Sequence, residues 1–493
     1  MAFGKRDRAG YGKVLLGLYA ILLLLMNLMR CWDNAVWGDE GYSVRLARLS
    51  FSGMLAETAE DVHPPLYYML LQVFERLFGG GWHVATVMTY AVVLVIGLTW
   101  IRRRFGCAGA ALFLTLASFL ESAVTFNVEI RMYSMASMFV LLSFIGLYEI
   151  LENGGWRDYL LFALFSLGGA YTHYFAILTE AFFYLYLLWD ALRRRHEAGV
   201  VKKVLVTCAV TVAGYLPWLL VFLQTLSDRL TDGFWLTGIP GIRDCLTYLF
   251  DGVLEVPLFL LYVVLVAAVI AARGPWLQGL RAKLPGTQKS SPAEGISAPT
   301  AERGRFVTWI LVGQFAIFGT MAVSLAVSNL ITPLFQVKYL FPASVIAWLS
   351  FAACISQFGR WKSAAALVLT AVIIVAYTPS YAATVEKERD RAAQTAVIVE
   401  ATADISADSC LVTDIDHFSW TVLEYYYPGT ENSLVSDLVG AADWEDDEVW
   451  LFWSSELEDG NLAILESAGY GVESVAEGYL GSGSETYVYL LTR

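Results

Sequence analysis

Long apolar runs recur along this chain of 493 residues, and they constrain its fold more than any other feature. An apolar run of about 17–25 residues forms a helix that can cross the hydrocarbon core of a bilayer. Hydrophobic residues make up 57% of the sequence and charged residues only 16%, a composition unlike that of a soluble protein. The sequence predicts a polytopic α-helical membrane protein with about eleven spans, of which the third and fifth are weaker. These are residues 14–28, 84–101, 107–123, 132–151, 159–171, 174–188, 204–223, 254–272, 306–327, 339–355 and 364–377.

Basic residues in the connecting segments predict the orientation of these spans, because Lys and Arg favour the cytoplasmic side. They gather before the first span and at 102–104, 193–195, 273–305 and 360–362, which are alternate loops. We therefore expect a multi-pass plasma membrane protein with a cytoplasmic N-terminus. The first span lacks a small-residue cleavage site, so we expect it to remain as an uncleaved helix.

Charge divides the chain into two regions of opposite character. From Glu386 to the end there are 23 acidic residues against four basic ones, a net charge of −19, and the remainder carries about +6. We expect a membrane domain at 1–384, with a flexible cytoplasmic loop at 273–305, and an extracytoplasmic domain at 385–493. The strongly acidic tail argues against nucleic acid as a partner.

The acidic region has the pattern of an α/β domain. We expect strands at 410–414, 448–453 and 485–491, and helices at 417–427 and 461–468. No glycine-rich loop follows the first strand, so we do not expect nucleotide binding there. The preferred interpretation is a lid or a domain that contacts the acceptor.

The first predicted outer loop, residues 31–83, is unusually long. Residues 41–49 can form an amphipathic helix, and two prolines can open a second helix at 66–78 that is apolar enough to lie in the membrane interface. Two such helices in one loop indicate a built site rather than a tether.

Polar clusters at the ends of the spans are the candidate functional residues, since ionisable groups are costly there. Five clusters fall on the predicted outer side, although the orientation was assigned from other residues. We therefore expect one site on that side. Its members are Asp39, Glu40, Asp61, His63, Glu129, Arg131, Tyr133, His173, Tyr174, Lys338 and Tyr339.

Structural interpretations of the same residues also exist. Asp39 and Glu40 could cap a helix that starts at Gly41, and Arg131 and Lys338 could reach lipid phosphates. The histidine at 173 could be a buried residue with a satisfied ring. Zinc binding by residues 61, 63 and 83 is disfavoured, because their spacing fits no metal signature.

Four of these clusters resemble elements of a known family. Asp39 and Glu40, followed by Asp-Val-His-Pro-Pro-Leu at 61–66, resemble the protein O-mannosyltransferase superfamily, which includes bacterial aminoarabinose transferases that act on lipid A. Glu-x-Arg-x-Tyr at 129–133 and Thr-His-Tyr at 172–174 are similar to elements of its bacterial members. The resemblance covers about residues 10–225 well. It implies a GT-C fold and a polyprenyl-phosphate sugar as donor.

The implied reaction requires one base and several cations. An acceptor hydroxyl must lose its proton as it attacks the anomeric carbon, and a carboxylate can remove it. The leaving phosphate needs cations rather than a proton. The resemblance implies that Asp39 is this base, and Arg131 and Lys338 are candidate phosphate partners. A single displacement predicts inversion at the anomeric carbon.

Other expectations remain open at this point. Glu40, Asp61 and His63 would orient the sugar or acceptor, or hold a divalent cation such as Mg or Mn together with Asp39. The acceptor could be a lipid, glycan or protein hydroxyl. Two alternative functions are a transporter or flippase of lipid-linked glycans, which should show internal repeats, and a non-catalytic membrane assembly protein.

Overall fold

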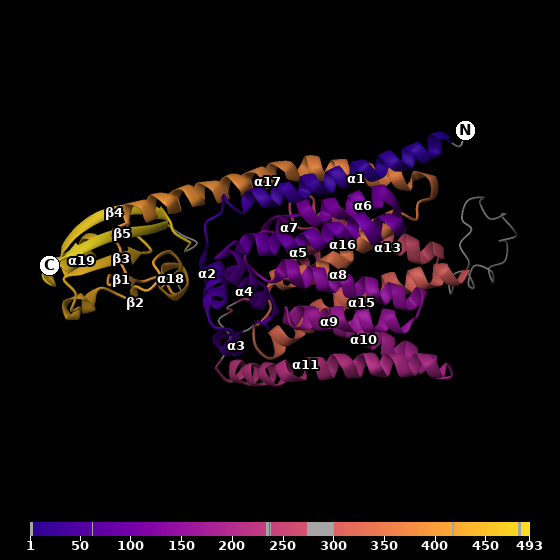
Figure 1. Ribbon diagram of the computed structural model, residues 1–493, viewed down its shortest axis with the longest axis horizontal. Coiled ribbons are helices and arrows are strands. Elements are labelled where there is room, and N and C mark those ends of the chain that lie inside the picture. Colours follow the sequence, from indigo (N-terminus) through magenta and orange to yellow (C-terminus); the bar gives the residue numbers. More distant parts are fainter. Residues whose placement is uncertain are drawn as a thin grey trace.

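The computed structural model describes residues 3–61, 63–232, 236, 238–273, 300–416, 419–481 and 485–493. A bundle of helices lies beside a small sheet domain along the longest axis of the molecule (Figure 1). We refer to the end of the bundle that contacts this domain as the domain end, and to the opposite end as the far end. Within the described residues, nine stretches are long and apolar enough to cross a membrane. The chain is thus a multi-pass membrane protein.

All eleven predicted spans correspond to helices. The stretch Trp82–Phe119 contains two of them, because the chain reverses at Gly106, where φ is 81°. The hydroxyls of Tyr90 and Ser118 then meet across the two antiparallel helices at 2.7 Å. The weaker fifth span is a helix of only 15 residues. The spans are formed by α1 (Phe3–Arg30), α5 (Trp82–Ile96) with η1 (Gly97–Ile101), α6 (Arg102–Phe119), α8 (Tyr133–Glu152), α9 (Trp156–Ala170), α10 (Tyr174–Arg193), α11 (Ala198–Asp232), α13 (Glu255–Arg273), α15 (Thr300–Leu330), α16 (Phe341–Ile355) and α17 (Lys362–Ala401).

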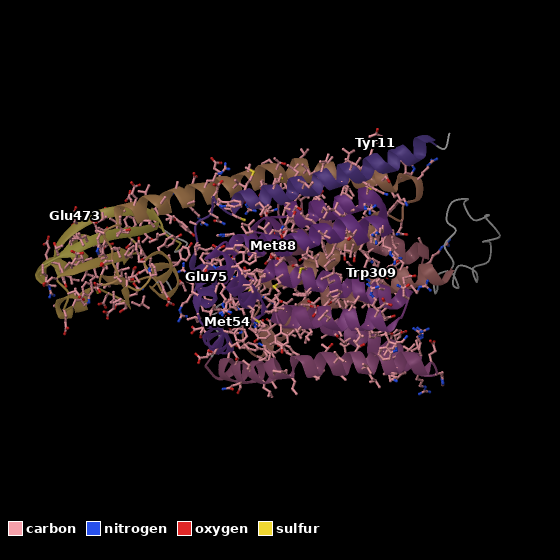
Figure 2. All side chains as sticks on the ribbon, in the orientation of Figure 1. Tyr11, Met54, Glu75, Met88, Trp309 and Glu473 are labelled. Carbon is pink, nitrogen blue, oxygen red and sulfur yellow. The ribbon has the colours of Figure 1, made fainter. Side chains whose placement is uncertain are left out.

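Aromatic side chains form much of the bundle core (Figure 2). Trp309 is fully buried and stacks on Phe144 with ring centroids 4.3 Å apart. Such contacts stabilise a pair beyond the area it buries. Tyr11, by contrast, lies exposed on α1. The bundle therefore has a packed interior and an apolar outer surface, as a membrane protein requires.

Short helices cover the domain end. They are α2 (Gly38–Arg48), α3 (Phe51–Glu60), α4 (Leu66–Phe78), α7 (Glu121–Phe126) and α12 (Ile242–Thr247), with 3-10 turns η2 (Tyr248–Phe250) and η3 (Val337–Leu340). The two helices predicted in the first loop are confirmed as α2 and α4, whereas α3 was not predicted. On α4, Tyr67 and Tyr68 are buried and Leu77 and Phe78 are exposed, which suits a helix at a membrane interface.

A five-stranded sheet forms the C-terminal domain, in the order β2-β1-β3-β5-β4. Strand β1 pairs in parallel with β2 and β3, and β5 is antiparallel to β3 and β4. The three predicted strands are confirmed, but β2 and β4 were missed. The elements of the domain are β1 (Cys410–Thr413), η5 (Ser419–Leu423), α18 (Glu424–Tyr426), β2 (Glu431–Leu434), η6 (Val439–Asp443), β3 (Glu448–Trp453), α19 (Asp459–Ser467), β4 (Gly471–Tyr479) and β5 (Glu485–Thr492).

Three predicted boundaries differ from those in the structure or lie outside the described residues. The expected domain boundary at 384/385 falls inside α17, which continues from the bundle to the sheet and hydrogen bonds β4 through Thr395 Oγ1 and the carbonyl of Tyr479 at 2.8 Å. Most of the expected loop 273–305 lies outside the described residues, and its last residues, from Thr300, are helical. The start of the helix predicted at 417 also lies outside them, and its described part is η5 and α18.

Candidate active site

The first turn of α2 is fixed by a buried carboxylate. The side chain of Glu40 is only 1% exposed, and it accepts hydrogen bonds from the backbone N–H of Ile130 at 2.8 Å and of Trp37 at 3.3 Å. The bond to Trp37 is the backbone half of a capping box. His83 Nε2 lies 3.2 Å from the same carboxylate. These contacts favour a positioning role for Glu40 over the expected contact with substrate.

Asp39, next to this anchor, is held between two cations. Its Oδ2 atom lies 3.8 Å from Arg131 Nη2 and 3.9 Å from Lys338 Nζ. Burial alone would raise the pKa of Asp39, but Arg131, Lys338 and His63 together lower it below its usual value. The side chain is still 40% exposed. Asp39 is therefore an ionised carboxylate that a substrate can reach.

Three buried donors near Asp39 have no hydrogen-bond partner among the described residues. They are Arg131 Nε, the hydroxyl of Tyr133 and Nε2 of His173. His173 Nδ1 accepts the backbone N–H of Phe175 at 3.1 Å, so in the neutral ring the proton sits on Nε2. A buried donor without an acceptor costs about 1–3 kcal/mol. Their common position indicates where an anionic ligand would complete the site.

The other predicted residues lie close to these donors, with their aromatic rings next to one another. His63 Nδ1 lies 3.2 Å from Asp61 Oδ2, and the His63 ring is 5.9 Å from that of His173. The His173 ring in turn lies 5.7 Å from Tyr339 and 5.5 Å from Tyr133. Burial, with nearby positive charges, holds the pKa of His173 well below its usual value. The ring is thus a neutral donor.

Glu129 completes the polar cluster in the turn between α7 and α8. Burial and the charge of Glu40 raise the pKa of Glu129 to about 8, although Arg131 acts in the opposite direction. At neutral pH this carboxyl is therefore mainly protonated, whereas Asp39 is ionised.

An apolar cavity of about 470 Å³ opens beside the cluster. Its polar end is formed by His63, His173 and Tyr339, and the rest lies among α10, α11 and α15. Tyr174 belongs to its wall, where its hydroxyl accepts a hydrogen bond from Trp218 Nε1 at 3.3 Å. The apolar wall includes Phe175, Ile177, Leu178, Ala181, Leu219, Phe222, Val323, Val327 and Leu334.

The residues do not fit a divalent cation. Within the described parts of the chain, no group of three or more His, Cys, Asp or Glu side chains is arranged to hold a metal ion. Asp39 faces two cations, and the oxygens of Glu40 already accept backbone hydrogen bonds. An oxygen-rich shell of the kind Mg²⁺ requires is not formed by these side chains.

Sequence reasoning missed two contributors to the site. The Tyr68 hydroxyl is fully buried next to Arg131, and Ser43 Oγ lies 3.4 Å from Arg131 Nη1. Tyr68 lies two residues after the 61–66 string, on the first turn of α4. Its position beside this motif was the feature of the sequence that could have identified it as a site residue. Ser43 lies one turn beyond Asp39, a spacing that places both on one face of α2.

The C-terminal domain packs directly on α2. A Cβ atom at Gly41 would lie 2.6 Å from the carbonyl oxygen of Thr421, so only glycine permits this approach. The Gly38 N–H donates to the carbonyl of Gly481 at 3.0 Å, and Arg45 pairs with Glu424 at 3.2 Å. The domain thus helps to position the helix that carries Asp39.

Comparisons with known proteins identify the fold. No family model and no curated protein matches the sequence. The structure is similar to the crystal structure of ArnT from Cupriavidus metallidurans bound to undecaprenyl phosphate, with a TM-score of 0.56 and 13% sequence identity over 97% of each chain. The match includes the C-terminal domain, to which the motif resemblance does not extend. The chain therefore has the GT-C fold that the motifs at its domain end had indicated.

Proposed function

We propose that this protein is a membrane glycosyltransferase that moves a sugar, a hexose or a derivative, from a polyprenyl-phosphate donor to an acceptor hydroxyl. One observation carries the proposal. The reachable carboxylate of Asp39 lies near two cations, and His173, which carries one of the unpartnered donors beside them, also lines the polar end of an apolar cavity. ArnT, which shares the fold, binds undecaprenyl phosphate. The same kind of ligand fits an apolar cavity that ends at donors and cations.

The donor phosphate would bind at Arg131 and Lys338. Both cations lie beyond hydrogen-bond distance of the Asp39 carboxylate, at 3.8 and 3.9 Å, so each can still donate to a phosphate oxygen. His173 Nε2 and the Tyr133 hydroxyl supply further donors. The polyprenyl chain would occupy the cavity wall between α10 and α15.

Asp39 would act as the general base. The acceptor oxygen attacks the anomeric carbon, its proton passes to the Asp39 carboxylate, and the bond from the anomeric carbon to the phosphate oxygen breaks. The polyprenyl phosphate leaves as an anion that Arg131 and Lys338 stabilise. One displacement of this kind inverts the anomeric configuration. No metal ion is needed for any of these steps.

We also propose an orientation in the membrane, based on the position of the basic residues. The basic loops lie at the far end, which we place on the cytoplasmic side with the N-terminus. The domain end then faces the extracytoplasmic side of the plasma membrane. A lipid-linked donor in the outer leaflet would reach the cavity from within the bilayer, and the acceptor would approach from water beneath the C-terminal domain.

Purified protein in detergent, incubated with undecaprenyl-phosphate hexoses and extracted membrane glycolipids, tests the proposal. We expect release of undecaprenyl phosphate and a product heavier by one sugar in mass spectrometry. Glycoconjugates from cells with and without the gene should differ by the same mass. Unchanged glycoconjugates in cells, together with no turnover of any donor in vitro, would contradict the proposal and favour a transporter or an assembly protein.

A further inference from the structure

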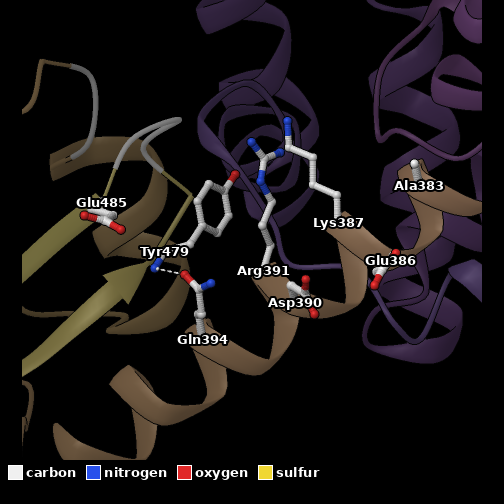
Figure 3. A pocket seen from close by; sticks show the side chains of 8 residues that line it. All are labelled: Ala383, Glu386, Lys387, Asp390, Arg391, Gln394, Tyr479 and Glu485. Carbon is white, nitrogen blue, oxygen red and sulfur yellow. Dashed lines mark hydrogen bonds between the residues drawn. The ribbon is translucent and has the colours of Figure 1, made fainter. Parts of the chain in front are cut away.

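A second cavity, lined mostly by polar residues, lies away from the candidate active site, between α17 and the strands β4 and β5 (Figure 3). Its volume is about 490 Å³, and it is open along one side. We refer to it as the junction groove. It is lined by Ala383, Glu386, Lys387, Asp390, Arg391, Gln394, Tyr479 and Glu485.

Two cations and a hydroxyl converge in the junction groove. Lys387 and Arg391 lie one turn apart on α17, and the guanidinium of Arg391 lies over the Tyr479 ring, 4.5 Å from its centroid. Figure 3 shows Lys387, Arg391 and the Tyr479 hydroxyl pointing to the same side, away from Glu386 and Asp390. This arrangement presents a planar donor fork, an ammonium and a hydroxyl to a single ligand.

Neither cation forms an ion pair within the parts of the chain that the structure describes. Their neighbour Arg389 differs, because it pairs with Asp33 at 3.0 Å. This difference stands out in a region that holds 23 acidic residues against four basic ones. Like charges one helical turn apart repel each other. A bound anion would relieve this repulsion.

The position of the groove points to a membrane lipid. Val368, Val372 and Val375 on α17 are exposed apolar residues, as expected for a surface that faces acyl chains. Ala383, the first residue of the groove, follows Val375 by eight residues, or about 12 Å along a helix. Lys387 and Arg391 lie further along, about 18 and 24 Å beyond Val375. Between them, Glu388 pairs with Arg30, two residues beyond the predicted end of the first span, and Arg389 pairs with Asp33. These pairs place the groove at the level where the first span leaves the hydrocarbon core.

We propose that the junction groove binds the phosphate headgroup of an anionic phospholipid. Arg and Lys side chains with a tyrosine hydroxyl match the charge and the acceptor oxygens of a phosphodiester. The open side leaves room for the rest of the lipid. The site is distinct from the donor phosphate site at Arg131 and Lys338, and the proposal does not depend on the enzymatic function.

Lipid binding here would also stabilise the contact between the two domains. Tyr479 lies two residues before Gly481, whose carbonyl accepts the N–H of Gly38 beside Asp39. A lipid bound in the groove would contact both α17 and the sheet, close to the hydrogen bond that joins the sheet to the start of α2.

Native mass spectrometry of the full-length protein with phosphatidylglycerol or phosphatidylcholine tests this inference. We expect phosphatidylglycerol to bind at least about tenfold more tightly than phosphatidylcholine, because both lipids carry the phosphodiester but only phosphatidylcholine adds a choline cation, which Lys387 and Arg391 would repel. The double variant Lys387→Gln/Arg391→Gln should lose this preference. The control is Arg389→Gln, which removes one positive charge from the same stretch of α17 but lies outside the groove lining, and it should keep the preference.

Three results would overturn the assignment. One is an unchanged lipid preference in the double variant, and another is an equal loss in Arg389→Gln, which would show non-specific attraction. The third is binding of inorganic phosphate that needs Lys387 and Arg391 without any preference for phosphatidylglycerol, because the ligand would then be a free phosphate group. Tyr479→Phe is a second test variant, which removes only the hydroxyl, keeps the ring under Arg391 and should therefore fold normally. It should weaken binding several-fold at an unchanged unfolding temperature, and undiminished binding in this variant would also count against the site.

Discussion

The two ends of the helical bundle use their charges in different ways. At the far end, three arginines pair with nearby carboxylates, two of them on a neighbouring helix, and each arginine remains partly exposed. At the domain end, Arg131 is only 6% exposed and shares Asp39 with Lys338 at distances near 4 Å. These far-end arginines are satisfied by carboxylates of the protein, whereas Arg131 and Lys338 at the domain end keep capacity for a ligand. The far-end pairs are Arg104–Glu149 at 3.0 Å, Arg305–Glu152 at 3.1 Å and Arg194–Glu197 at 2.6 Å.

The largest expected effect is that of Asp39→Asn. Loss of the general base should lower the rate of sugar transfer by about 10²–10⁴-fold. The fold should persist, because this side chain is partly exposed and forms no close ion pair. Turnover by purified protein measures the effect, with Asp33→Asn as the matched control in the preceding loop. Comparable rates in Asp39→Asn and wild type would remove Asp39 from the mechanism.

Lys338→Gln should have the next largest effect. Removal of one phosphate partner should raise the KM for the donor by about 10–100-fold, because a hydrogen bond to a charged group contributes about 1.5–3 kcal/mol. The far-end variant Arg305→Gln should leave KM unchanged, since exposed ion pairs contribute at most about 1 kcal/mol to stability. Equal effects of the two substitutions would erase the contrast between the ends.

Gly41→Ala tests whether the C-terminal domain positions α2. The new methyl group would lie 2.6 Å from the carbonyl oxygen of Thr421, whereas a Cβ at Gly38 meets no atom within 4 Å. Overpacking of this kind costs about 1–3 kcal/mol. We expect a several-fold lower kcat for Gly41→Ala at a similar donor KM, and near wild-type kinetics for Gly38→Ala. A kcat equal in both variants would mean that the domain contact does not position Asp39.

The smallest effect concerns pH. Burial raises the pKa of Glu129 to about 8, so this carboxyl is neutral below that pH and ionises above it. Ionisation adds a negative charge near Arg131 and should weaken donor binding a few-fold between pH 7.5 and about 9. Because the pKa of Asp39 is lowered, its own titration should not limit the rate above pH 5. Glu129→Gln should abolish the alkaline decline, and a decline that persists in this variant would assign it to another group.

The sequence predicted the spans because each must be apolar over its whole length in a bilayer. It also placed Asp39, Arg131, His173 and Lys338 at one end, since chain orientation alone fixes which span ends are neighbours. The sequence could not show that the Glu40 carboxylate accepts a hydrogen bond from the backbone of Ile130. That residue lies 90 positions along the chain, and no local pattern reveals such a contact.

Other features escaped prediction for similar reasons. The strand β2 has four mostly exposed residues and lacks an apolar pattern. A buried carboxyl, Glu180 in α10, accepts a hydrogen bond from Ser143 at 2.7 Å within the bundle, and only the packing of three helices shows where it lies. The continuity of α17 was hidden because its charged outer turns differ in composition from its apolar span.

Binding of undecaprenyl phosphate to the purified protein, measured by native mass spectrometry, tests the account of the domain end most directly. Wild type should bind it, and Asp39→Asn should bind it at least as tightly, because Arg131 and Lys338 would then no longer share their charge with a carboxylate. Lys338→Gln should bind it more weakly, and Arg305→Gln should match wild type. No binding by wild type, or loss of binding in Asp39→Asn, would contradict the separate roles of the base and the phosphate site.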